Sequence, residues 1–251
     1  MTAESLTNPI DRLMERASRE LFETRYFDAA ESCVDALRMA RSGDDFARMA
    51  RICLPLQEAR RWIRQTALDT GSVRVVADSA HLPEPLGPGC YLVEPPLVGI
   101  DGRRLRQHAW REGVAVAVLC REPMNRQGLW PIVGVGERVV RVRIDPPSNV
   151  RRVAEPPRGP TGDRIEGEID PAWFAEAGEA LGDRAIVDAE AAGDEHDPPA
   201  WRVDDLLDLL EAAPDHEKLV QSLARACREA VGTTTPTDLR RRRGMDDPNS
   251  F

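Results

Sequence analysis

The side chains best suited to chemistry follow two predicted parallel strands in the middle of the chain. Glu94 ends the first strand, and Cys120, Arg121 and Glu122 end the second. Because α/β sheets bind ligands beyond the carboxyl ends of their parallel strands, these side chains are expected to share one edge. A thiol beside a cation can act as a nucleophile, and a carboxylate beside an arginine can do acid–base work. The alternative, favoured by the absence of an assignable base or oxyanion donor, is a buried Cys120 with solvated neighbours.

A second candidate for chemistry is His108, on the helix expected between these two strands. It precedes the inward-facing Ala109, so a nucleophile–base pair with Cys120 is conceivable, although a lone histidine at such a position is more often structural. The run of acids and histidine at 194–197 lacks the spacing that converges metal ligands. Neither GxxxxGK[ST] nor GxGxxG occurs. We therefore expect no metal and no cofactor.

The elements that position these residues are read from the hydrophobic pattern of the middle segment. Strands are predicted at 73–77, 90–94 and 114–120, and a helix at 101–112. The last of these strands is apolar on both faces, which is typical of a buried central strand. The pattern predicts a right-handed βαβ unit. Two further strands, at 130–135 and 138–144, are expected to form a hairpin.

The first 71 residues predict three to four amphipathic helices. Asn8-Pro9 provides a cap and a proline in the first turn, and apolar residues then recur at helical intervals as far as Ala67. Breaks are expected at Ser42-Gly43-Asp44 and at Leu54-Pro55, because glycine and proline disfavour a helix interior.

Part of this segment resembles a tetratricopeptide repeat. Residues 25–37, RYFDAAESCVDAL, look like the second helix of such a repeat, and LQEA at 56–59 followed by Ala67-Leu68 is a weaker echo. The stretch LGDRAI at 181–186 is loosely similar to the turn of that family. The resemblance implies a concave face that receives a peptide or a helix of another protein. The residues expected to contribute to such a groove are Tyr26, Cys33, Phe46 and Trp62.

Helices are also predicted in the last third of the chain. Asp170-Pro171 offers a cap and a helical start, and a hairpin is expected from residues 203–213 and 215–231, with Asp215 as a cap of the last helix. The segment 146–169 is rich in proline and is expected to be an extended or partly disordered linker. Residues 232–251, which include Arg240 to Arg243, predict a disordered tail.

Composition excludes several classes of partner. The 251 residues carry a net charge of −9, which repels a phosphate backbone, so nucleic acid is a poor partner; the four arginines of the tail are expected to be solvated. No apolar run reaches the roughly 18 residues that a membrane span needs, so no membrane partner is expected. The five cysteines form no CxxC pair and no signal peptide is visible, which favours the cytoplasm.

These observations predict an α+β protein with N-terminal helical hairpins (1–71), a central βαβ unit with a β-hairpin (72–145), the linker, a helical region (170–231) and the tail. The leading functional hypothesis is a non-catalytic interaction module that binds a peptide or helix of a partner protein. The alternative is a small-molecule-binding protein or enzyme with its site at the strand ends. If the terminal helices instead pack on the sheet, the groove between them would not exist.

Overall fold

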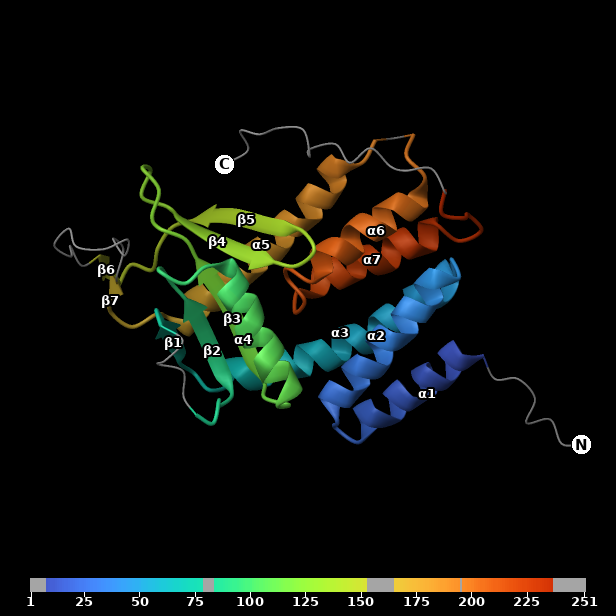
Figure 1. Cartoon of the computed structure of the whole chain (residues 1–251), viewed down its shortest axis with the longest axis horizontal. Coiled ribbons are helices and arrows are strands. Elements are labelled where there is room, and N and C mark those ends of the chain that lie inside the picture. The colour runs from blue at the N-terminus through green and yellow to red at the C-terminus, as the bar shows by residue number, and fades with distance from the viewer. Residues whose placement is uncertain (1–7, 79–83, 153–164, 195, 237–251) are drawn as a thin grey trace, which may run out of the picture.

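The fold is α+β, as the sequence predicts: helices at both ends of the chain enclose a central mixed sheet (Figure 1). The computed structural model describes residues 8–78, 84–152, 165–194 and 196–236. Within these residues, no helix combines the length and apolar character that crossing a membrane requires.

Three antiparallel helices begin the chain: α1 (Pro9–Phe22), α2 (Tyr26–Ser42) and α3 (Phe46–Leu68). The Asn8 side chain caps α1 by accepting a hydrogen bond from the Ile10 amide, and Asp45 caps α3 in the same way. Each connection turns through one left-handed residue, Thr24 or Asp44. These local signals account for where the helices start and end.

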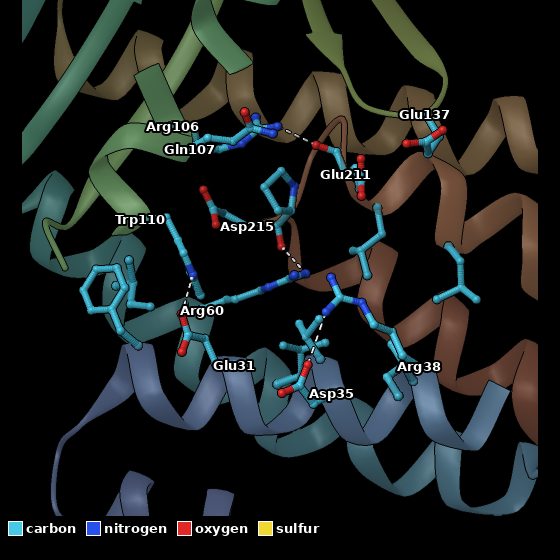
Figure 2. A pocket seen from close by; sticks show the side chains of 18 of the residues that line it. Glu31, Asp35, Arg38, Arg60, Arg106, Gln107, Trp110, Glu137, Glu211 and Asp215 are labelled. Carbon is cyan, nitrogen blue, oxygen red and sulfur yellow. Dashed lines mark hydrogen bonds and ion pairs between the residues drawn. The ribbon is translucent and has the colours of Figure 1, made fainter. Parts of the chain in front are cut away.

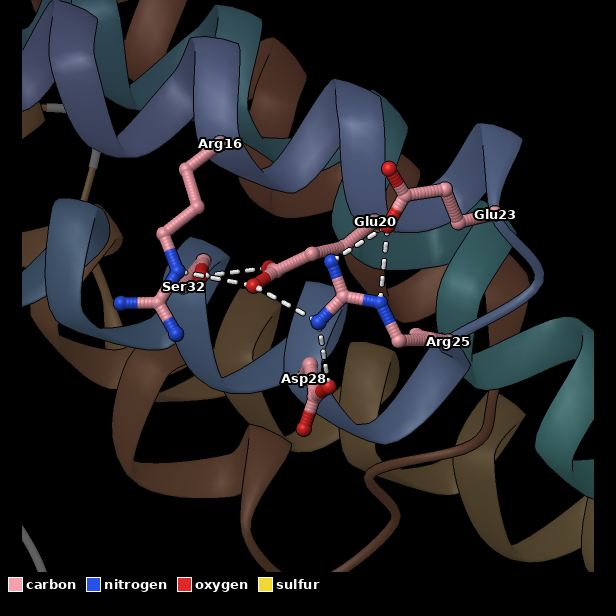
Figure 3. A network of polar contacts seen from close by, with 6 residues as sticks. All are labelled: Arg16, Glu20, Glu23, Arg25, Asp28 and Ser32. Atoms are coloured by element: carbon pink, nitrogen blue, oxygen red, sulfur yellow. Dashed lines mark hydrogen bonds and ion pairs between the residues drawn. The ribbon is translucent and has the colours of Figure 1, made fainter.

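A buried carboxylate joins α1 to α2. Glu20 is 1% exposed; its Oε2 accepts a hydrogen bond from the Ser32 hydroxyl at 2.7 Å and its Oε1 one from Arg16 Nε at 2.7 Å (Figure 3). Arg25 Nη1 lies 3.7 Å from the same carboxylate. A buried charge is tolerated only with such partners, so this network fixes how the two helices pair.

The expected break at Leu54-Pro55 is wrong, because α3 runs without interruption through Pro55. A proline inside a helix removes one backbone hydrogen bond. Here the neighbouring Leu54 is 71% exposed, so the affected side of the helix faces solvent. The opposite side packs against α2, α7 and the sheet, and these contacts stabilise the continuous helix.

The central sheet has the strand order β1 (Val73–Val76), β2 (Gly89–Val93), β3 (Val116–Arg121), β4 (Trp130–Val135), β5 (Val139–Ile144). The first three strands are parallel, and the last two complete the sheet as an antiparallel hairpin. The helix α4 (Gly99–Arg111) connects β2 to β3, which confirms the predicted βαβ unit.

The two faces of the sheet have different covers. On one face α4 packs Leu105 and Ala109 against Tyr91 and Cys120. On the other face α3 and α5 (Pro171–Ala192) close a larger core that also includes residues of α1, α2, α6 (Pro199–Leu210) and α7 (Glu217–Glu229). The terminal helices therefore share one continuous core with the sheet.

The linker and last helices depart from expectation at three points. The two ends of the predicted linker pair as short strands, β6 (Arg151–Arg152) and β7 (Ile165–Glu166), whereas residues 153–164 lie outside the described residues. The predicted turn at 181–186 is wrong, because α5 continues through it. The cap of α7 is His216, whose Nδ1 accepts a hydrogen bond from the Leu219 amide, and not Asp215.

The described chain ends beside the turn between α2 and α3. The Thr235 amide and hydroxyl both donate to the Asp44 carboxylate, at 2.9 and 2.6 Å. These hydrogen bonds lower the pKa of Asp44. The arginines Arg240 to Arg243 lie outside the described residues.

Candidate functional site

The strand-end residues Glu94 and Arg121 meet, but in a closed contact. Arg121 Nη2 donates to Glu94 Oε2 at 2.6 Å, and the two side chains are 0% and 2% exposed. The Arg121 guanidinium also lies over the Trp130 ring, 4.7 Å from its centroid. An ion pair that is sealed by an aromatic ring has the geometry of a core contact and offers no opening for a substrate.

The other strand-end candidates are spread over different environments. Cys120 is buried, and burial raises the pKa of its thiol to about 12, so it is a neutral thiol at pH 7. Glu122 forms a two-pronged ion pair with Arg141 at 2.7 and 2.9 Å. His108 is exposed on α4, whereas Cys120 packs beneath Gly102 of the same helix. The structure thus places the proposed nucleophile under the buried face of α4 and the proposed base on an exposed part of that helix.

The four residues predicted to line a groove divide into two pairs. Tyr26 and Trp62 stack with their ring centroids 5.6 Å apart, and Trp62 is 41% exposed. Cys33 and Phe46 are each 1% exposed and belong to the core. Tyr26 also lines a shallow depression of about 540 Å³ beside Ile63 and Thr66. Only the aromatic pair is accessible to a partner.

A larger cavity than this depression lies between α2 and α4. It has a volume of about 800 Å³ and is also bordered by α3 and by the segment that follows α6 (Figure 2). One face of α2 lines it from Phe27 to Ser42, which corresponds to about 22 Å of helix. The apolar residues of its walls include Val34, Leu37, Leu56, Ile63, Val114, Val116, Leu207 and Leu210.

Polar and charged side chains at the rim of this cavity are hydrogen-bonded to one another. The Trp110 indole donates to Glu31 at 3.0 Å. Arg38 contacts Asp35 at 3.2 Å, as Figure 2 shows, and Arg103 contacts Glu211 at 2.8 Å. The rim therefore has few free charges with which to hold a ligand.

The floor of the cavity is formed by Arg60 of α3, Arg106 of α4 and Asp215, all half-buried. Arg60 Nη1 donates to the carbonyl of Pro214 at 3.1 Å. Arg106 Nη2 donates to the carbonyl oxygens of Glu211 and Val135 at 2.6 and 3.4 Å. Within the described residues, neither guanidinium has a carboxylate partner within hydrogen-bond reach, and the Asp215 carboxylate makes no hydrogen bond.

Burial controls the electrostatics of this floor. It lowers the pKa of both Arg60 and Arg106, and the Asp215 charge opposes this effect. Burial likewise raises the pKa of Asp215, against the influence of Arg106 and Arg60. Perturbed groups that converge in a cavity are typical of binding sites. Two cations and one anion can together hold an anionic group.

The cavity was not predicted from the sequence, although a signal for it exists. Arg60 falls between Leu56 and Ile63 on the inward stripe of its helix, and Arg106 falls on the inward side of α4 between Gly102 and Ala109. An arginine within an otherwise apolar stripe indicates either a buried ion pair or a cavity. Asp215 gave no such signal, because its position before a helix is fully explained by capping.

Comparison of the chain with protein-family models, with curated proteins and with solved structures found no match.

Proposed function

We propose that this protein is a binding module whose central cavity, between α2 and α4, receives a segment of a partner protein. The observation that carries the proposal is the length of the cavity along α2, about 22 Å from Phe27 to Ser42. A stretch of that length accommodates about seven extended residues or four turns of helix. An elongated cavity of this length fits a chain segment better than a compact molecule.

The walls of the cavity support this proposal. Apolar side chains of α2, α3 and β3 provide the surface that anchors a hydrophobic residue, and polar side chains surround this surface. Recognition of helices in grooves relies on this combination. This cavity is formed by α2 together with α4 and the α6–α7 connection. The groove expected from the sequence involved the terminal helices alone.

A small molecule is the second candidate, because the volume of about 800 Å³ also falls in the range of small-ligand sites. The strand-end enzyme site is less well supported, since Glu94 and Arg121 neutralise each other in the core.

The test uses a variant that fills the cavity. Val34→Trp places an indole at a half-buried position of the α2 wall, and Val187→Trp adds the same indole at a 52% exposed position of α5, outside the cavity lining. Twelve-residue peptides are selected on the wild-type protein from a random display library, and their affinities are measured by isothermal titration calorimetry. We expect Val34→Trp to weaken binding at least about tenfold, and Val187→Trp to leave it unchanged.

Peptides that bind all three proteins equally would contradict the proposal. If instead no peptide is selected, but members of a small-molecule library raise the melting temperature of the wild type and of Val187→Trp and not that of Val34→Trp, the second candidate is correct. Circular dichroism establishes that both variants are folded.

A further inference from the structure

We infer that the segment bound in the central cavity presents an acidic side chain, from glutamate or aspartate, to Arg60 and Arg106. This inference rests on the proposed function and adds the chemistry by which the partner is recognised.

The first support is the unused hydrogen-bonding capacity of the floor. Each guanidinium carries five N–H donors. Arg60 uses Nη1 and Arg106 uses Nη2, in both cases for main-chain carbonyls. The other donors make no hydrogen bond to the described residues, although both side chains are half-buried. A carboxylate accepts from such forks in a two-pronged geometry that few other groups match.

The second support is charge balance. Arg60 and Arg106 bring two positive charges to the floor and Asp215 brings one negative charge, which leaves one positive charge unmatched. The acids of the rim do not use the remaining donors of the floor: Glu211 attracts both arginines, but its carboxylate pairs with Arg103, and Glu31 accepts from the Trp110 indole. Arg60 and Arg106 also repel each other electrostatically. One added carboxylate neutralises the floor.

The same balance distinguishes between anions. A phosphorylated side chain carries a charge of about −1.5 to −2 and would leave excess negative charge beside Asp215. Figure 2 shows Arg60 and Asp215 between Glu31 on one side and Arg38 on the other, and the lining of α2 extends past both. The carboxylate is therefore expected on an internal residue of the segment. A carboxylate at a chain terminus would leave one half of the cavity empty.

The test starts from the peptides selected above. We expect them to share a Glu or Asp at one fixed position, and expect its replacement by Gln or Asn to weaken binding to the wild type about tenfold or more. Arg106→Gln should weaken binding of the parent peptide to a similar extent. It should weaken binding of the peptide with Gln or Asn at the fixed position little further. The four affinities form a double-mutant cycle. Arg184→Gln is the matched control: its side chain is 51% exposed, pairs with Asp188 and does not line the cavity, so affinity should stay within about twofold.

The outcomes separate this inference from the proposed function. Peptides that lose affinity for Val34→Trp but keep it when their acidic residue becomes an amide would overturn the inference and leave the function standing. Peptides that Val34→Trp does not affect would overturn both. A phosphoserine at the fixed position that binds more tightly than glutamate would also refute the choice of carboxylate. The peptide-side substitution decides the question even if Arg106→Gln does not fold.

Discussion

Three buried or half-buried arginines of this protein have different surroundings, which favour a structural role for one and a binding role for the other two. Arg121 has a carboxylate at 2.6 Å and an aromatic ring over its guanidinium, so its charge is satisfied inside the core. Arg60 and Arg106 reach only main-chain carbonyls and border the cavity. The ion pair of Arg121 thus offsets the free energy cost of burying its charge. For Arg60 and Arg106 that cost is only partly offset, so both guanidinium groups are available to a ligand.

At this residue scale, Glu94→Gln is expected to destabilise the fold by about 3 kcal/mol, because it removes the carboxylate charge that pairs with the buried Arg121 guanidinium at 2.6 Å. Glu122→Gln is the matched control, since its pair with Arg141 is 34% and 43% exposed and should cost less than about 1 kcal/mol. Urea unfolding, followed by tryptophan fluorescence, measures both free energies of unfolding. Equal losses from the two substitutions would show that the Glu94–Arg121 pair is not a core contact.

At the scale of elements, α5 positions the floor of the cavity through a glycine. A Cβ at Gly182 would lie 2.0 Å from Cγ of His216, so only glycine lets the imidazole pack against this helix. His216 caps α7 through its Nδ1, and Asp215 precedes it in the chain. The contact between α5 and His216 therefore determines where Asp215 faces the cavity.

Gly182→Ala is accordingly expected to destabilise the protein by about 2 kcal/mol or more, because His216 must move and the α7 cap is lost. Gly178→Ala on the same helix is the control: its Cβ would meet its nearest neighbours at 4.0 Å, so the change should be neutral or stabilise by up to about 1 kcal/mol. Thermal and urea denaturation of the two variants test the difference. A neutral Gly182→Ala would mean that α5 does not constrain His216.

At the scale of the whole molecule, α3 is the shared centre. One side of it packs on α1 and α2, and the other side contacts α7 and strands β2 and β3. The buried core that includes Met49 and Leu56 of α3 extends without a break to Leu223 of α7 and Leu119 of β3. The cavity is bordered by α3 together with α2, α4 and the segment that follows α6.

We therefore expect one cooperative unfolding transition, in which far-ultraviolet circular dichroism and tryptophan fluorescence give the same midpoint. A fragment of residues 1–71 is expected to lack a stable fold, because the face of α3 that packs on α7 and the sheet would be exposed. Two separated transitions, or a folded fragment, would show that the N-terminal helices are an independent domain.

The sequence by itself determined the kinds of elements and most of their boundaries. Helical and alternating periodicity, with caps such as Asn8 and Asp170, predicted the terminal helices, the βαβ unit and the hairpin. These features depend on interactions within a few residues, which a local pattern records. The same pattern failed at Pro55, where packing on two sides outweighs the local preference against a helix.

Only the tertiary structure decided where the candidate site lies. Arg60, Arg106 and Asp215 are more than 40 residues apart in the chain, and each has an ordinary local explanation as part of a helix or a cap. The sequence could mark the two arginines as exceptions on apolar stripes but could not show that they face one space. That meeting depends on how α3 and α7 pack on one face of the sheet and α4 on the other, which is set by long-range contacts that short-range periodicity does not encode.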